Sequence, residues 1–206
     1  MVILKSRDEI ATMRRAGRVV ARTLERVTAA VRPGVTLREL DELGARTIAG
    51  EGATASFLGY HADAAVTVPV GEIDPAARRL LEATERALWA GIEQARVGNR
   101  LSDISHAVGQ VAHAAGYGIL ADHGGHGVGQ LLHEDPSVDN DGRPGRGPRL
   151  RDGLVLAIEP MFVDGDPAYV HRPDGWAVAA RDGSRSAHFE HTVAVLDEGP
   201  EPLTVP

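Results

Sequence analysis

Hydrophobic positions in the first thirty residues follow the spacing of an amphipathic helix. Apolar residues recur at steps of three and four across positions 10–27, so they share one helical face. Ser6 and Glu9 precede this run with the spacing of a capping box, which marks a helix N-terminus. Pro33 follows the run and cannot continue a helix. The pattern predicts one long helix that ends before Pro33.

The same signals predict a second helix directly afterwards. Thr36 and Glu39 form another capping box, and residues 50–52 supply glycines that end the helix. The residues expected on its buried face are aliphatic: Leu37, Leu40, Leu43 and Ile48.

A pair of helices with this layout is predicted again further along the chain. It begins near Pro75, turns near Gly98 and ends at Gly116. A shift of the chain by 64 residues superposes Arg22 on Arg86, Leu24 on Leu88, Arg32 on Arg96, Gly34 on Gly98, Leu37 on Leu101 and Gly52 on Gly116. Either the two pairs repeat a common helical pattern by chance or the chain consists of two related halves.

Short apolar runs interrupted by Gly, Pro and Asp are typical of strands. They occur at positions 66–70, 154–158, 161–163 and 192–196. The stretch 140–151 is rich in Gly, Pro and Arg and is predicted to be an exposed loop. Because helices and strands come in blocks, the pattern favours an α+β fold with helices on one face of a sheet.

Composition restricts the function classes. The chain has 206 residues, no Cys and a formal net charge of -7, from 29 acidic and 22 basic residues. This negative balance argues against nucleic acid as the main ligand. No stretch has the apolar length of a signal peptide or of a membrane span. We therefore expect a soluble cytoplasmic protein without a membrane partner, forming a single domain over residues 1–206.

Strong metal ligands stand beside predicted strands at four places. They are Asp63, the His126 and His133 of GGHGVGQLLHEDP, Glu159 at the end of LVLAIE, and Glu190 at the start of EHTVAVL. Each has a simpler explanation when taken alone, such as a strand cap, a Gly-rich turn, an ion pair or a solvated position. A carboxylate at the end of a buried strand is nevertheless costly unless it is paired, hydrogen-bonded or bound to a metal. Together the residues suit Mn, Fe, Co or Zn.

Longer segments carry a resemblance to a known family. They are DEIATMRRAGRVVARTL, GGHGVGQLLHEDP, LRDGLVLAIEPMF and DGWAVAARDGSRSAHFEHTVAV. Over nearly its whole length the chain resembles the type I methionine aminopeptidases of the pita-bread metallopeptidase superfamily. The resemblance implies pseudo-symmetric halves, here about residues 1–70 and 71–206, with helices packed on a curved, mostly antiparallel sheet. It also implies a pair of divalent ions and removal of the initiator methionine from nascent proteins.

The resemblance assigns roles residue by residue. The implied metal ligands are Asp63, His126, Glu159 and Glu190. His133 matches the histidine that contacts the substrate and the developing tetrahedral intermediate. Tyr60 matches a wall of the methionine side-chain pocket, and Trp176 matches an aromatic residue beside the active site.

The sequence departs from the family after the segment FLGYH. The family continues with a His in a segment like CHGIP and with a strand like GDIVNIDV that carries a further metal-binding Asp. This chain passes directly to ADAAVTVPVGE, so strands of the first half are expected to be missing. The absent Asp belongs to the second metal site, and the resemblance therefore implies one bound ion (Co, Fe, Mn or Zn) rather than two.

The implied function is metal-dependent hydrolysis of the first peptide bond of a nascent polypeptide or peptide, at a rate reduced by the missing segment. Glu159 is expected to accept a proton and His133 to hydrogen-bond the substrate carbonyl. Two alternatives stay open: an inactive relative that binds a peptide or a partner, and an Xaa-Pro aminopeptidase of the same superfamily. The spacing in HGVGQLLHE and the short region before Asp8 favour the methionine type. The sequence carries no signal for an oligomeric state, although a homodimer would cover a sheet face left by missing strands.

Overall fold

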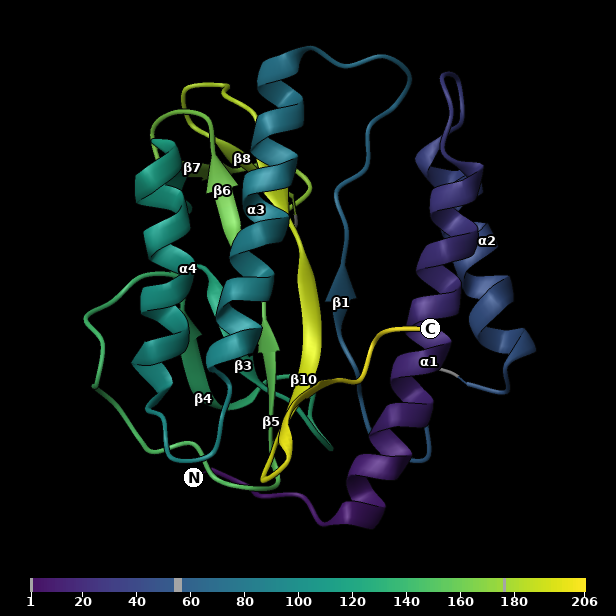
Figure 1. Cartoon of the computed structure of the whole chain (residues 1–206). Helices are drawn as coiled ribbons and strands as arrows, with labels where there is room; N and C mark the ends of the chain where they lie inside the picture. Colours follow the sequence, from purple (N-terminus) through teal and green to yellow (C-terminus); the bar gives the residue numbers. More distant parts are fainter. Residues whose placement is uncertain (1, 54–56, 176) are drawn as a thin grey trace.

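The computed structural model describes residues 2–53, 57–175 and 177–206. The helices in this part of the chain are α1 (Arg7–Ala30), α2 (Leu37–Gly50), α3 (Pro75–Gln94) and α4 (Leu101–Ala115) (Figure 1). The strands are β1 (Ala64–Ala65), β2 (Gly118–Ile119), β3 (Gly124–Gly127), β4 (Glu134–Asp139), β5 (Leu154–Ile158), β6 (Met161–Val163), β7 (Tyr169–His171), β8 (Val178–Ala180), β9 (Ser186–His188), β10 (Glu190–Leu196) and β11 (Gly199–Pro202). Within the described ranges, each helix is too short or too polar to cross a bilayer.

The four predicted helices are confirmed, and so are the signals that begin and end them. The capping box at the start of α1 is complete, because the Ser6 hydroxyl accepts from the Glu9 N–H while the Glu9 carboxylate accepts from the Ser6 N–H. Thr36 and Glu39 make the same pair of bonds at the start of α2. These reciprocal bonds satisfy backbone donors that the first helical turn leaves unpaired.

The glycines that the 64-residue shift superposes have matching backbone conformations. Gly34 and Gly98 have φ angles of 90° and 94°, and Gly52 and Gly116 have φ angles of 73° and 75°. A residue with a Cβ atom is strained at such positive φ angles, whereas glycine is not. The repeat therefore corresponds to two helical hairpins, α1–α2 and α3–α4, with equivalent turns.

The central sheet is antiparallel; α3 and α4 pack on it through the main core, and the start of α1 packs on it through a smaller cluster that includes Ile10 and Val155. Its strands follow the order β1-β10-β5-β3-β4, and β11 also pairs with β10. In Figure 1, α3 and α4 cover one face of the sheet, while α1 and α2 stand beside the edge strand β1. The main core joins α3 and α4 to the strands through buried side chains such as Leu88, Ile104, Leu156 and Phe162. The predicted α+β class is confirmed.

Two predictions for the first half were wrong. The strand expected at 66–70 is instead the two-residue β1, Ala64–Ala65, because the chain leaves β10 after Ala65. The predicted buried face of α2 is not buried: Leu37 is 85% exposed and Leu40, Leu43 and Ile48 are half-buried. An apolar helix face becomes buried only where another element covers it, and α2 packs mainly against α1.

The loop expected at 140–151 is exposed over most of its length, but Asn140 at its start and Leu150 near its end are buried. Asn140 is 3% exposed and Leu150 is 1% exposed. Leu150 belongs to the main core, and the Asn140 side chain donates to the backbone oxygen of Glu159. Arg- and Gly-rich composition predicted the middle of the loop correctly and missed the residues that anchor it.

Candidate metal centre

The register of the sheet places the predicted ligand residues at the same level. β5 runs antiparallel to β10, and His191 pairs with Ile158, so Glu159 at the end of β5 lies beside Glu190 at the start of β10. On the other side of β5, His126 of β3 pairs with Ala157. Asp63 immediately precedes β1, whose Ala65 pairs with Glu190. Four segments distant in sequence therefore bring these side chains to one region.

The donor atoms of these side chains lie close together. The His126 Nε2 atom is 3.5 Å from Glu159 Oε1 and 3.9 Å from Asp63 Oδ2. Asp63, His126 and Glu190 each offer a donor atom within 4.8 Å of the others. Glu159, Glu190 and His188 likewise offer donor atoms within 4.8 Å of one another, and His188 was not predicted as a ligand. The structure thus brings Asp63, His126, Glu159 and Glu190 together, and their role as metal ligands stays a prediction.

Burial gives the cluster its electrostatic character. The side chain of Glu190 is 4% exposed. Burial, followed by the charges of Asp63 and Glu159, raises the pKa of the Glu190 carboxyl to about 9. A nearby cation reverses this effect, since it favours the carboxylate form and offsets the repulsion among the three acids. The electrostatics of the cluster therefore favour a bound cation.

Unpartnered atoms test whether these residues fit a metal ion. Glu190 Oε1 and His188 Nε2 are buried and have no hydrogen-bond partner, although His188 Nε2 lies only 3.3 Å from Glu159 Oε2. The atoms are close to one another without being aligned for hydrogen bonds. Buried polar atoms are seldom left unpaired, whereas ligands of an ion point at a shared centre. The donor set of carboxylates and imidazoles fits a divalent metal ion.

Neighbouring groups fix the orientation of the proposed ligands. The Nδ1 atom of His126 lies 2.8 Å from the carbonyl oxygen of Gly127, so in the neutral ring Nδ1 carries the proton and Nε2 is free to bind a metal. The hydroxyl of Thr192 accepts from the Asp63 N–H and donates to the Asp63 carbonyl, both at 2.8 Å. Thr192 is completely buried. It is a positioning residue that the sequence analysis did not identify.

Two glycines beside His126 are required by packing. A Cβ atom on Gly125 would lie 2.1 Å from the carbonyl oxygen of Ala157, and one on Gly127 would lie 2.2 Å from that of Asp135. The absence of a side chain at both positions allows β3 to fit between its neighbours, which sets the position of His126.

The predicted substrate-binding residues have different surroundings. The exposed ring of His133 lies beside that of His126, with the ring centroids 4.2 Å apart, so it stands at the rim of the cluster. The Tyr60 hydroxyl donates to Glu9 on α1 at a distance of 2.6 Å. Trp176 lies outside the described residues.

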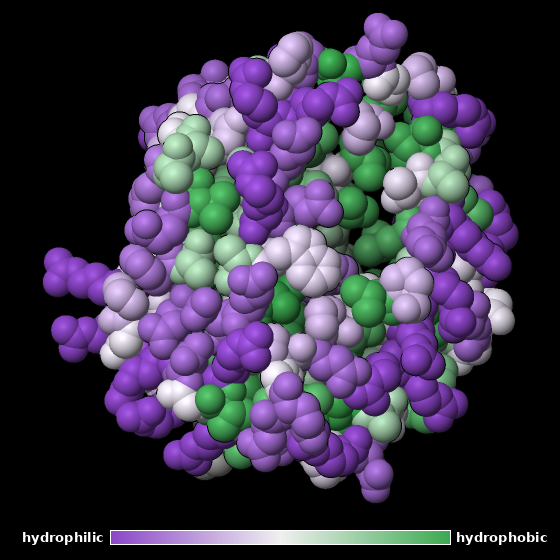
Figure 2. Space-filling model, in the orientation of Figure 1, coloured by the Kyte–Doolittle hydropathy of each residue, from purple (hydrophilic) through white to green (hydrophobic). Residues whose placement is uncertain are grey.

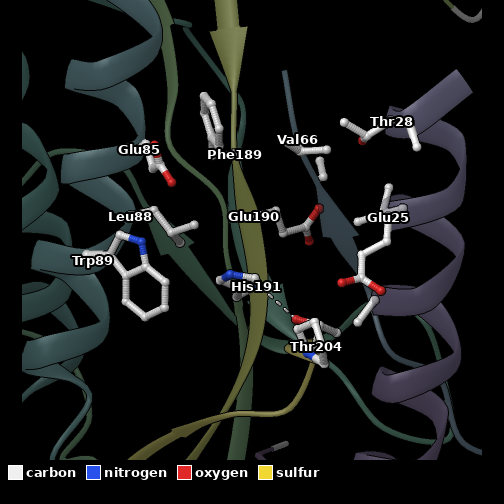
Figure 3. A pocket seen from close by; sticks show the side chains of 15 residues that line it. Glu25, Thr28, Val66, Glu85, Leu88, Trp89, Phe189, Glu190, His191 and Thr204 are labelled. Carbon is white, nitrogen blue, oxygen red and sulfur yellow. Dashed lines mark hydrogen bonds between the residues drawn. The ribbon is translucent and has the colours of Figure 1, made fainter. Parts of the chain in front are cut away.

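A cavity of about 580 Å³ adjoins the cluster (Figure 3). It lies between α1 and α3, with β1 and β10 at its back. Its lining is mostly apolar and includes Leu24, Val66, Leu88 and Trp89. Glu190 lines the cavity and also belongs to the candidate metal centre, so the cavity reaches the buried carboxylate.

Comparisons with known proteins agree with this geometry. A family model described as metallopeptidase family M24 matches residues 52–197. The methionine aminopeptidase of Clostridium perfringens is 40% identical over 247 residues, covering 100% of this chain and 99% of that protein. A crystal structure of the methionine aminopeptidase from Thermotoga maritima has a TM-score of 0.96 at 32% identity, with 100% of each chain covered. Prolidase from Pyrococcus furiosus has a TM-score of 0.80 at 18% identity, covering 99% of this chain and 66% of that one, a likeness of fold alone.

Proposed function

Because the chain belongs to metallopeptidase family M24, we propose that it is a methionine aminopeptidase. It removes the N-terminal methionine of a polypeptide or peptide by hydrolysis of the first peptide bond. The observation that carries this proposal is the convergence of Asp63, His126, Glu159 and Glu190 on one partly buried centre. Relatives named as methionine aminopeptidases match over their full length, which supports the same reaction. We infer nascent chains in the cytoplasm as its substrates.

The reaction combines a bound ion with side chains around it. When bound by these residues, a divalent Co, Fe, Mn or Zn ion supplies polarisation of the scissile carbonyl and a lowered pKa for a coordinated water. Glu159, with a side chain only 12% exposed, accepts the proton that the attacking water releases. His133 at the rim donates a hydrogen bond to the substrate carbonyl oxygen as negative charge develops there.

The alignment supports a missing internal segment. It spans 247 residues for the Clostridium perfringens relative, 41 more than this chain contains. Between α2 and α3 the described residues form β1 and no other named strand. We place the missing segment after His61, where the family motif breaks off. Loss of its Asp removes one carboxylate near the reacting groups, and a deficit of several kcal/mol there would slow the reaction roughly a thousandfold.

Methionine release from a Met-Ala-Ser peptide tests the proposal. The freshly purified, monodisperse protein is assayed with Mn, Fe(II) or Co, and we expect slow but measurable release. Glu159→Ala should lose this activity and keep its fold, since both a ligand and the proton acceptor are removed. Glu93→Ala, on an exposed position of α3, is the matched control and should retain it.

Three results would contradict the proposal. The first is unchanged activity in Glu159→Ala, and the second is cleavage of an Xaa-Pro peptide in preference to Met-Ala-Ser. The third is a folded wild-type protein that neither binds a divalent ion nor turns over, which would mark it as a binding protein.

A further inference from the structure

His188 is a fifth potential ligand in the candidate metal centre. It ends β9, two residues before Glu190, so its side chain lies on the same side of the extended chain as that of Glu190. The His188 Nε2 atom is 3.3 Å from Glu159 Oε2 and 3.8 Å from Glu190 Oε2. It is not part of the ligand set that the family resemblance implies.

Thr67 holds the backbone of His188 in the way that Thr192 holds Asp63. The Thr67 hydroxyl accepts from the His188 N–H at 2.9 Å and donates to the His188 carbonyl at 2.8 Å. Thr192 and Asp63 lie on neighbouring segments of the sheet region, and so do Thr67 and His188. His188 is therefore held in place by its backbone, while its Nε2 atom remains unpaired.

Glu159 lies between the two histidines. Its Oε1 atom is 3.5 Å from Nε2 of His126, and its Oε2 atom is 3.3 Å from Nε2 of His188. Each oxygen thus faces a different imidazole nitrogen. The ions of two-metal sites lie about 3.5–4 Å apart, and Glu159 would present one oxygen to each of two such neighbouring positions.

Glu190 contributes to both positions as well. It belongs to one three-residue group with Asp63 and His126, and to another with Glu159 and His188. Its buried Oε1 atom has no hydrogen-bond partner, although its side chain is 96% buried. A second ion would satisfy both this oxygen and the unpaired nitrogen of His188.

We propose that His188, Glu159 and Glu190 form a second divalent-metal position, adjacent to the one formed by Asp63, His126 and the same two glutamates. The proposal rests on the proposed function, because it takes the first position to bind metal. It revises the expectation of a single ion. That expectation followed from the absent family Asp and did not include His188 as a ligand. In this chain His188 would supply the nitrogen ligand of a position that does not depend on the absent family Asp.

Metal stoichiometry tests this assignment without an assay of activity. Metal-free wild-type protein is titrated with Mn(II), with bound ions counted by elemental analysis and their coupling recorded by electron paramagnetic resonance. We expect two ions per chain with a spin-coupled spectrum. His188→Ala should bind one ion with an uncoupled spectrum, because the second position loses its only nitrogen donor. His171→Ala, on exposed β7, is the control and should still bind two.

The possible outcomes separate the two proposals. One ion in both the wild type and His188→Ala overturns the second position and leaves the proposed function intact, as do two coupled ions in both. No ion in folded wild-type protein overturns the proposed function itself. Circular dichroism checks the fold of His188→Ala. If that variant is unfolded, His188→Gln, which keeps side-chain bulk, must lose the second ion for the proposal to stand.

Discussion

Lys5 is the only lysine in the chain, and its side chain is buried against Glu134, the residue after His133. The two side chains are 3% and 4% exposed, and the Lys5 ammonium donates to the Glu134 carboxylate. The Lys5 N–H also donates to the carbonyl of Gly153. This buried ion pair ties the N-terminal segment to the turn that carries His133. A residue distant in sequence from the candidate metal centre therefore supports its rim.

Removal of Lys5 should destabilise the protein strongly. Lys5→Met leaves the Glu134 carboxylate buried without its partner, and we expect a loss of about 3–5 kcal/mol in the free energy of unfolding. Arg22→Met breaks the exposed pair with Glu51 and should cost less than about 1 kcal/mol. Urea unfolding at pH 7 measures both. Equal losses in the two variants would show that the buried Lys5–Glu134 pair contributes no more to stability than an exposed ion pair.

The pH dependence of the same variant has a definite sign. Burial opposes ionisation of Glu134, but the hydrogen bonds from Lys5 and Leu131 outweigh it and lower the pKa of the carboxyl below 4.5. In the wild type this pair contributes its full stability above pH 4.5, the ordinary pKa of a glutamate. The contribution is lost as the pH falls through the lowered pKa of Glu134. In Lys5→Met, protonation instead relieves the buried charge. Without Lys5, burial raises the pKa of Glu134, so the stability difference between the two proteins should begin to shrink above pH 4.5 and shrink further as the pH falls through the lowered wild-type pKa. A difference that stays constant with pH would contradict this account.

Single residues show how far the sequence alone could predict the site. Asp63, Glu159 and Glu190 could be found because each is a carboxylate next to an apolar run. His188 has a comparable signal, since it lies two residues before Glu190 in an extended segment, but it is not among the ligands that the family resemblance implies. Thr192 and Thr67 could not be found, because their hydroxyls matter only through backbone groups distant in sequence.

The two helical hairpins differ in what covers them. In α4, six residues are buried, including Leu101, Ile104 and Val108, whereas in α2 the only buried residue is Thr47. Capping boxes and glycine turns are local signals, so the helix ends could be predicted from the sequence. Burial depends on a distant partner, so neither the exposed face of α2 nor the short β1 could be predicted in the same way.

Hydrogen exchange should reveal this difference between the helices. Isolated helices of this length are marginally stable in water, and tertiary packing supplies most of their stability. We expect backbone amides in the middle of α2 to exchange at least about tenfold faster than those of α4 under native conditions. Amide exchange followed by NMR or mass spectrometry measures the rates. Equal protection would mean that α2 has a packing partner in solution, such as a second copy of the chain.

At the scale of the whole molecule, the hairpins enclose different spaces. Beneath α3 and α4 lies a closed core, whereas the part of α1 from Ala21 onward faces β1 and β10 across the cavity of about 580 Å³. Figure 2 shows hydrophobic residues at the bottom of a hollow on this side of the molecule. Two equivalent helical layers therefore rest on unequal amounts of sheet. Among the described residues between α2 and α3, β1 is the strand that borders this cavity.

Paired substitutions can measure the difference in free space beside α1 and beneath α3. Ala21 on α1 lines the cavity, and Ala87 on α3 lies in the closed core; they are 4% and 0% exposed. Ala and Leu have similar helix propensities, so a change to leucine reports mainly on space. Ala21→Leu should raise the free energy of unfolding by about 1 kcal/mol, because added methylene groups leave water without displacing protein atoms. Ala87→Leu should lower it by about 1–3 kcal/mol through overpacking. Denaturant unfolding of both variants gives the comparison, and a loss in Ala21→Leu as large as that in Ala87→Leu would mean that the space beside α1 is already filled in solution.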